Sequence, residues 1–262
     1  MKIKYSARSH MGNVRTNNED NLFVNGVTLP IGMEDRSFSI DGCAEAPAIF
    51  AVCDGMGGED DGEAASRLAV ETLCDCKKRI QDAVPGGLNA AVQAYTTLAS
   101  QKITLKTAIG KRSGTTLALA VVSKYGIRCF NAGDSRIYFD RRGVFRQVTY
   151  DHTVAVDLER ANSGQRPRAG TGHMLTRCMG IGKPPEAERY PTLPLNGRLL
   201  ICSDGLDKMM RDEEIQSVLE NCVPPAQAAD TLLATALQRG GLDNVTLIVI
   251  DTEGVRIPFP MR

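Results

Sequence analysis

Apolar segments of this sequence meet carboxylates at their ends in several separate places. The runs AIFAVC, IRCFNAG and RLLICS are each followed by an aspartate, and NLFVNG and VTLIVI closely follow acidic residues. The residues concerned are Asp54, Asp134, Asp204, Asp243, Glu19 and Asp20. If these strand ends share one edge of the sheets, their negative charges meet and need cations to neutralise them. Oxygen ligands completed by water are what Mg²⁺ and Mn²⁺ prefer, so the pattern predicts a carboxylate metal centre.

The stretch after Asp54 is poor in side chains. The sequence GMGG occupies positions 55–58, and glycines allow another group to approach the backbone closely. We expect these glycines to leave room for a hydrated metal and to expose a backbone carbonyl that can ligate it. The alternative for each aspartate is an ordinary turn residue, and we assign Asp41-Gly42 to such a turn with no further role.

The composition argues against several classes of function. The 262 residues include 31 Lys and Arg and 31 Asp and Glu, so the formal net charge is zero. This balance disfavours a general affinity for nucleic acid or for an anionic membrane. The apolar runs are too short to cross a bilayer. The N-terminal sequence MKIKYSARSH lacks the apolar core of a secretory signal.

The chain has eight cysteines but no C-x-x-C, the usual spacing of zinc ligands. Cys53, Cys129 and Cys202 lie in apolar, strand-like runs, where a free thiol packs as a small hydrophobic group. We therefore expect all the cysteines to be buried, reduced thiols in a cytoplasmic protein. A zinc site or disulfides are the less favoured alternatives.

The expected secondary structure separates into blocks of strands and pairs of helices. Strand-like segments fill most of the first fifty residues, and strands resume with TTLALAVVS in short hairpins. Apolar periodicity predicts helices over about 63–80 and 88–106, and two more over 211–222 and 225–239. This order favours an α+β fold in which helical hairpins cover antiparallel sheets.

Seven short motifs, each weak alone, follow one another along the chain. They are RTNNED (15–20), DGMGG (54–58), SGTT (113–116), GDSR (133–136), LTR (175–177), SDG (203–205) and DNVT (243–246). Together they resemble the metal-dependent protein Ser/Thr phosphatases of the 2C type, particularly bacterial ones, over about residues 5–251. The resemblance implies a single catalytic domain over 1–262, built as a four-layer α-β-β-α sandwich of two antiparallel sheets flanked by helical pairs.

Position by position, the resemblance implies roles for the carboxylates. Asp54 corresponds to the ligand that bridges two tightly bound Mn²⁺ or Mg²⁺ ions, and Gly55 to a ligand that uses its carbonyl. Asp204 and Asp243 correspond to further direct ligands of one ion. A water between the ions would then attack phosphorus, and no protein nucleophile is required.

The other residues of the implied site lie around the two metal ions. Glu19 and Asp20 correspond to positions that hold waters, and Asp134 to the position that binds a third, weaker ion. Arg15 corresponds to the phosphate-binding arginine, whose planar guanidinium matches paired phosphate oxygens. As an alternative, Arg136 could pair with Asp134 and make that carboxylate purely structural.

A variable flap beside the active site is implied at about residues 155–174. The segment 151–174 by itself predicts a short helix and then a loop rich in Gly, Arg and Pro, and loops of this length are often functional. Arg166 and Arg168 lie in this loop and would contact an acidic or phosphorylated partner, with a solvated loop as the alternative. We therefore expect substrate preference to reside in the flap.

Met56 departs from many eukaryotic members, which have His there as the proposed acid for the leaving alkoxide. A thioether cannot donate a proton, so that role is vacant or passes to a water; bacterial relatives share the Met. We assign structural or surface roles to His10, His152 and His173. None of these three forms a convincing Ser-His-Asp set in the sequence.

The sequence thus predicts a metal-dependent protein Ser/Thr phosphatase that hydrolyses phosphoserine and phosphothreonine and opposes Ser/Thr kinases. We expect phosphorylated proteins and a cognate kinase as partners, no nucleic acid, no membrane span, and a monomer. Two alternatives stay open: a dedicated phosphatase of one regulator, such as an anti-sigma-factor antagonist, and a non-catalytic phosphoprotein-binding module. The second would have lost metal-binding carboxylates, and all of them are present. A nuclease would need a basic groove that this neutral chain does not indicate.

Overall fold

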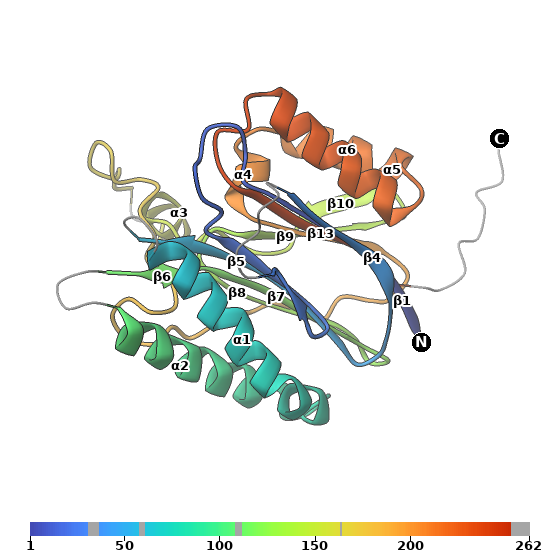
Figure 1. Cartoon of the computed structure of the whole chain (residues 1–262), viewed down its shortest axis with the longest axis horizontal. Coiled ribbons are helices and arrows are strands. Elements are labelled where there is room, and N and C mark those ends of the chain that lie inside the picture. The colour runs from blue at the N-terminus through green and yellow to red at the C-terminus, as the bar shows by residue number, and fades with distance from the viewer. Residues whose placement is uncertain (31–36, 58–60, 108–111, 163, 253–262) are drawn as a thin grey trace.

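Two antiparallel sheets face each other, and each carries a pair of helices on its outer face (Figure 1). The computed structural model describes residues 1–30, 37–57, 61–107, 112–162 and 164–252. Gly58 and the part of VTLPIGM beyond residue 30 lie outside the described residues. The order of layers is helix, sheet, sheet, helix, which confirms the four-layer fold that the resemblance implies.

The first sheet contains six strands, each antiparallel to its neighbours. In spatial order they are β10 (Val144–Gln147), β9 (Arg136–Arg141), β12 (Arg198–Cys202), β13 (Val245–Thr252), β1 (Lys2–His10) and β4 (Ser37–Glu45). The helices α5 (Asp212–Asn221) and α6 (Pro225–Gln238) cover its outer face. Pro225 at the first turn of α6 suits a helix start, because its fixed φ is already helical.

The second sheet is also antiparallel. In spatial order it contains β11 (Glu188–Arg189), β8 (Gly126–Ala132), β7 (Leu117–Ser123), β5 (Ala48–Met56), β2 (Asp20–Val24) and β3 (Val27–Thr28), and β6 (Gly114–Thr115) pairs with β5. The helices α1 (Asp61–Asp82) and α2 (Leu88–Lys106) pack on its outer face, in the lower part of Figure 1. The predicted bounds of α2 are confirmed, and α1 extends two residues beyond its prediction at each end.

β5 is buried on both of its faces, which explains its continuous apolar sequence. Phe50 and Val52 point into the core between the sheets, while Ile49 and Ala51 pack against α1 and α2. Alternate residues of a strand point to opposite faces, so both sets must be apolar when both faces are covered. The strand is therefore held rigidly up to its end, where Asp54 lies.

Two sequence predictions about surface groups are wrong. Asp41 and Gly42 are not a turn but lie inside β4, where Asp41 pairs with Arg8 at 2.7 Å. Gly42 is needed because the ring of Tyr5 on the neighbouring strand lies where a Cβ would be. Cys43 and Cys74 are exposed, since each lies on the outward side of its strand or helix, whereas Cys53, Cys129 and Cys202 are buried as expected. None of the described helices is long and apolar enough to cross a membrane.

Arg198 in β12 generates a prediction about stability. Its side chain is 4% exposed, and its guanidinium donates to Asp251 of β13 at 2.6 and 2.8 Å. It also donates to the carbonyl of Leu219 in α5 and to those of Cys222 and Val223 after this helix. Replacing Arg198 with Met leaves these acceptors unpaired, and removing one partner of a buried ion pair costs about 3–5 kcal/mol. Urea denaturation should show this loss in the free energy of unfolding.

The control for this prediction is Lys102→Met. Lys102 pairs with Asp75 at 3.0 Å between α2 and α1, with both side chains exposed. An exposed pair of this kind contributes about 0–1 kcal/mol, so this variant should unfold close to the wild type. Equal losses in the two variants would contradict the role assigned to Arg198.

Candidate functional site

Strand ends from both sheets bring the predicted carboxylates to one end of the molecule. Asp54, near the end of β5, lies directly opposite Asp20, the first residue of β2, in the antiparallel register. Asp134 lies in the turn between β8 and β9. One residue separates Asp204 from the end of β12, and one separates Asp243 from the start of β13. The expected gathering of carboxylates at one edge is therefore present in the structure.

These carboxylates are close enough to disturb one another's ionisation. Burial, and then the charges of Asp20, Asp204, Asp134 and Asp243, raise the pKa of Asp54 well above its usual range. Burial and nearby aspartates also raise the pKa of Asp20 to about 7 and that of Asp134 to about 6. Such shifts mean that the neighbouring groups do not fully neutralise this negative charge, a condition that a bound cation relieves.

Hydroxyl groups of two motifs hold the backbone of Asp54 in place. Its N–H donates to the hydroxyl of Thr116 at 2.9 Å, and its carbonyl accepts from the hydroxyl of Thr115 at 2.9 Å. The hydroxyls of Thr116 and Ser135 are hydrogen-bonded at 2.7 Å. The SGTT motif thus supports the Asp54 backbone directly, and Ser135 of the GDSR motif supports it through the Thr116 hydroxyl.

Two other polar residues position Asp20 and Glu19. Ser203, just before Asp204, donates its hydroxyl to the carboxylate of Asp20 at 2.7 Å. Asn244 accepts the N–H of Glu19 at 2.8 Å and donates to the carbonyls of Met11 and Asn17 at 2.9 and 2.8 Å. Sequence reasoning missed Asn244, although its place directly after Asp243 in the DNVT motif was a usable signal.

Gly55 is required by the close approach of neighbouring backbone. A side chain at Gly55 would collide with the carbonyl oxygens of Gly62 and Glu19, and the N–H of Gly55 donates to the Glu19 carbonyl at 3.1 Å. Glu19 itself places its carboxylate against Gly62 at the start of α1. The space that we expected around Gly55 is therefore filled by the loop before β2 and the first turn of α1.

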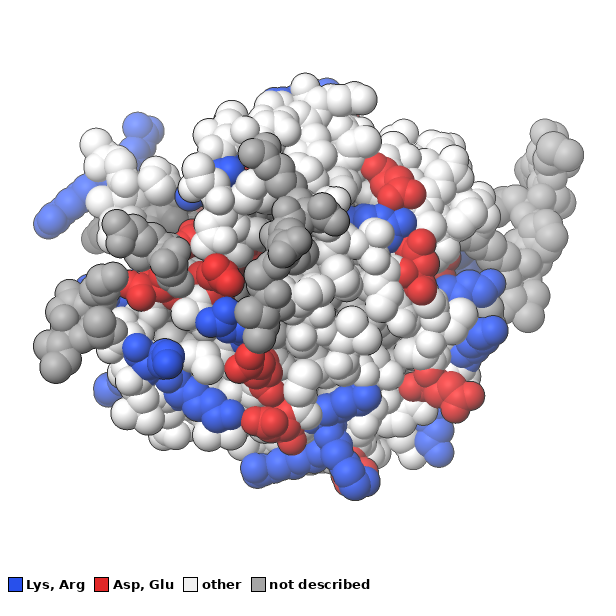
Figure 2. All heavy atoms as spheres, in the orientation of Figure 1, with Lys and Arg blue, Asp and Glu red and all other residues white. Residues whose placement is uncertain are grey.

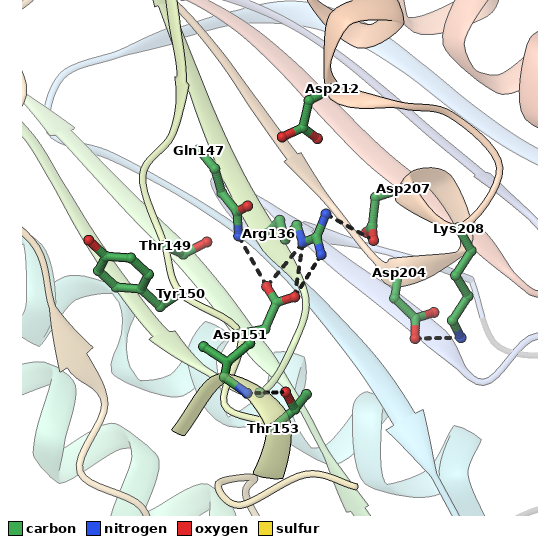
Figure 3. Close-up of polar contacts among 12 residues, drawn as sticks. Arg136, Gln147, Thr149, Tyr150, Asp151, Thr153, Asp204, Asp207, Lys208 and Asp212 are labelled. Atoms are coloured by element: carbon green, nitrogen blue, oxygen red, sulfur yellow. Dashed lines mark hydrogen bonds and ion pairs between the residues drawn. The ribbon is translucent and has the colours of Figure 1, made fainter. Parts of the chain in front are cut away.

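Two half-exposed cations lie against the cluster. Arg15 grips the carboxylate of Asp243 with two bonds, from Nε at 2.9 Å and from Nη2 at 3.0 Å. Lys208 places its Nζ 2.6 Å from Asp204, a contact drawn in Figure 3, and 3.3 Å from Asp243. The side chains of Arg15 and Lys208 are 49% and 50% exposed, so both heads can move away without unfolding the chain around them.

Arg136 pairs with Asp151 at 2.7 Å and with Asp207 at 3.1 Å, as Figure 3 shows, so the alternative pairing with Asp134 is wrong among the described residues. Asp207 ends the short helix α4 (Asp204–Asp207) and was not predicted. Its Oδ1 is buried without a hydrogen-bond partner in the described structure, and burial raises its pKa to about 8. Its signal was the spacing D-G-L-D, which puts both carboxylates on one helical turn.

The donor set suits a hydrated divalent ion. Within the described residues, no three acidic, histidine or cysteine side chains converge closely enough to form a ligand set by themselves. Mg²⁺ commonly takes only one or two carboxylates, keeps several waters and needs no closed cage of protein ligands. Paired aspartates such as Asp20 and Asp54 fit that preference.

The predicted flap begins with α3 (Val154–Arg160) and continues as a loop that projects from the body of the molecule (Figure 1). Arg166 and Arg168 are exposed on this loop. Among the described residues, no hydrogen bond or ion pair joins them to the carboxylates, so the structure does not bring them into the site. On the face drawn in Figure 2, Lys and Arg alternate with Asp and Glu and form no continuous basic area.

Comparison with known proteins identifies the sequence class. The protein phosphatase 2C family matches residues 34–239. The chain is 32% identical over 95% of its length to the serine/threonine protein phosphatase PstP of Mycobacterium tuberculosis, of which it spans 45%. It is 27% identical to the serine/threonine phosphatase stp of Listeria monocytogenes, over 94% of each chain.

A solved structure gives the matching fold. The catalytic domain of PstP in complex with two manganese ions superimposes with a TM-score of 0.72 at 30% identity, covering 97% of this chain and 99% of that one. The chain thus corresponds in length to that catalytic domain and to about half of the full PstP relative.

The raised pKa of Asp20 leads to a prediction about pH. In chelator-treated protein, the folded chain keeps the carboxyl proton of Asp20 up to about pH 7. The unfolded chain releases the same proton at about pH 4. The contribution of Asp20 to the free energy of unfolding therefore falls as pH rises from about 4 to about 7. Asp20→Asn removes this cost, so the variant's thermal melting temperature should gain on the wild type across that window.

Asp75→Asn, the same substitution on the exposed side of α1, serves as the control and should not reproduce this gain. An Asp20→Asn variant that gains nothing over the wild type between pH 4 and 7 would show that Asp20 does not titrate in this way.

Proposed function

This chain belongs to the protein phosphatase 2C family, and we propose that it is a metal-dependent protein Ser/Thr phosphatase. In this proposal it hydrolyses phosphoserine and phosphothreonine in proteins and opposes Ser/Thr kinases. The observation that carries the proposal is the group of carboxylates gathered at the ends of both sheets, with the guanidinium of Arg15 beside them. Two metal ions bound by carboxylates, together with an arginine, suit phosphoryl transfer, which depends mainly on positioning and charge neutralisation.

The proposed cofactors are two tightly bound Mn²⁺ or Mg²⁺ ions and a third, weaker one. Asp54 would bridge both tight ions, Gly55 would be a ligand through its carbonyl, and Asp204 and Asp243 would be further ligands of one ion. The residues around them are Glu19 and Asp20, which would hold waters, and Asp134, which would bind the weaker ion. When bound, the ions would supply an activated water and neutralise charge on the phosphoryl group.

The chain's own groups would bind and orient the substrate. Arg15 is held by Asp243 through Nε and Nη2, which leaves further N–H groups of its planar guanidinium for a phosphate oxygen. Its half-exposed position lets it meet a phosphorylated side chain from solvent. Met56 offers no proton to the leaving alkoxide, so we propose that a water supplies it.

Partners and location are also proposals. We propose phosphorylated proteins as substrates, a cognate Ser/Thr kinase as the opposing enzyme, and a cytoplasmic monomer, in line with eight free cysteines. We treat 1–262 as one catalytic domain with a flap at about 155–174. The exposed Arg166 and Arg168 on that loop would contact acidic or phosphorylated surfaces and set substrate preference. A narrow preference would make the chain a phosphatase of one regulator.

The first test is metal dependence. Chelator-treated protein should lose activity on a phosphothreonine peptide, and added Mn²⁺ or Mg²⁺ should restore it, because no protein nucleophile is required. Alkylation of the exposed Cys43 and Cys74 should leave most of the activity. Full activity after rigorous metal removal would sink the proposal, and stoichiometric inactivation through one cysteine would favour a thiol-based enzyme.

A second test separates metal binding from phosphate binding. Asp54→Asn should weaken binding of the tight ions by more than about 100-fold in calorimetric titration, because outer partners of ligands already change metal affinity about 10- to 100-fold. Arg15→Ala should keep the metal stoichiometry and lower kcat/KM. Arg15→Lys, which keeps the charge without the planar fork, should recover only part of that loss. Near-normal kcat in Asp54→Asn would contradict the assignment.

A further inference from the structure

His152 is fully buried and lies directly beside the residue that precedes Asp134. Its ring Nδ1 accepts the N–H of Gly133 at 3.1 Å, and its own backbone N–H donates to the Gly133 carbonyl at 2.9 Å. His152 therefore binds both polar groups of Gly133, and the Asn131 amide also donates to the Gly133 carbonyl at 3.1 Å. The sequence assigned His152 only a structural turn, and its burial distinguishes it from the exposed His173.

The hydrogen bonds of His152 define its protonation. Because Nδ1 accepts from Gly133, Nε2 must carry the proton of the neutral ring, and it donates to Glu188 Oε2 at 2.8 Å. Burial lowers the pKa of His152, which favours this neutral form. Glu188 thus selects the tautomer that can hold Gly133.

Glu188 also connects this residue to the flap. Arg160, at the end of α3, donates to both carboxylate oxygens of Glu188 at 2.7 and 3.1 Å. On the other side of the flap, the carbonyl of His152 accepts the N–H of Thr176 at 2.9 Å. The start and the end of the flap are therefore both tied to the same buried histidine.

Gly133 cannot easily move away from His152. Its φ is +120°, a conformation that favours glycine, and a Cβ there would collide with the side chain of Thr116. On the other side of Asp134, Ser135 is bound to Thr116 at 2.7 Å. Asp134 is thus held between two fixed neighbours, and a rotation of the Gly133 peptide would redirect its carboxylate.

We propose that His152 is a positioning residue that aims Asp134 through the two hydrogen bonds to Gly133, with Glu188 fixing the histidine tautomer. This inference rests on the proposed function, in which Asp134 binds the third, weaker ion. A purely structural histidine would contribute to stability without affecting that ion selectively.

Two matched substitutions separate the two sides of the ring. In His152→Asn the amide oxygen replaces Nδ1 and keeps the acceptor for the Gly133 N–H, whereas in His152→Gln the amide reaches the place of Nε2 and keeps, of the two ring contacts, only the one with Glu188. The backbone hydrogen bond from residue 152 to the Gly133 carbonyl remains in both variants. Calorimetric titration with Mn²⁺ should show the weaker binding step reduced about 10- to 100-fold in His152→Gln, with the tight pair unchanged. His152→Asn should stay within about threefold of the wild type, well inside that range.

Arg160→Met controls for the flap. This variant removes the ion pair between Arg160 and Glu188 but leaves the hydrogen bonds to Gly133 in place. The affinity of its weaker Mn²⁺-binding step should therefore be close to that of the wild type. Thermal melts should show similar losses of stability in His152→Asn and His152→Gln. Equal weakening in these two variants, or a loss in Arg160→Met as large as in His152→Gln, would overturn the positioning role.

Asp134→Ala distinguishes this inference from the function on which it rests. If Asp134→Ala still shows the weaker Mn²⁺-binding step, Asp134 does not bind the third ion. If Asp134→Ala loses this step but His152→Gln keeps it, only the positioning role of His152 is wrong. Nitrogen NMR of the wild type needs no variant, and it should show His152 protonated at Nε2. The Gly133 amide signal should follow the weaker Mg²⁺ titration step. A proton on Nδ1 would overturn the proposal even if the variants fail to fold.

Discussion

The burial of several carboxylates at one end of two sheets is the constraint on which the rest of the structure depends. Asp20 is 2% exposed and faces Asp54 across the ladder between β2 and β5. Their raised pKa values express the free-energy cost of keeping these charges together and away from water. Such an arrangement opposes folding unless a cation is present in the working protein, so the proposed ions and the fold stabilise each other.

The two packed sheets hold the strand ends rigidly, and this keeps the buried carboxylates together despite the free-energy cost. Covered faces fix β5 up to Asp54, the Asp54 N–H donates to the Thr116 hydroxyl, and the Ser203 hydroxyl donates to the Asp20 carboxylate. The same sequence motifs therefore contain both proposed ligands and residues that support them through hydrogen bonds. The geometry of ligands depends on the hydrogen bonds that hold them. Asn244, which binds the Glu19 backbone, and His152, which binds Gly133 beside Asp134, are therefore part of the site.

The sequence predicted those features that arise locally. The bounds of α2 followed from apolar periodicity and the break before it, and the carboxylate cluster followed from the places where apolar runs end. It failed where the partner is distant in sequence. Asp41-Gly42 has the composition of a turn but pairs with β1, and Arg8 is the cation for Asp41. Likewise, only the fold shows that Arg136 reaches Asp151 and Asp207.

Cations in this protein fall into two kinds, and burial separates them. Arg198 is 4% exposed between carboxylate and carbonyl oxygens, and Arg136 is enclosed by Asp151 and Asp207. Moving either would leave buried acceptors unpaired, so these two belong to the frame. Arg15 and Lys208 are half exposed on the carboxylate cluster, where an ion pair contributes little and can exchange partners at small cost. A site that must admit ions and a phosphate needs replaceable cations at its rim, and this is where the chain places them.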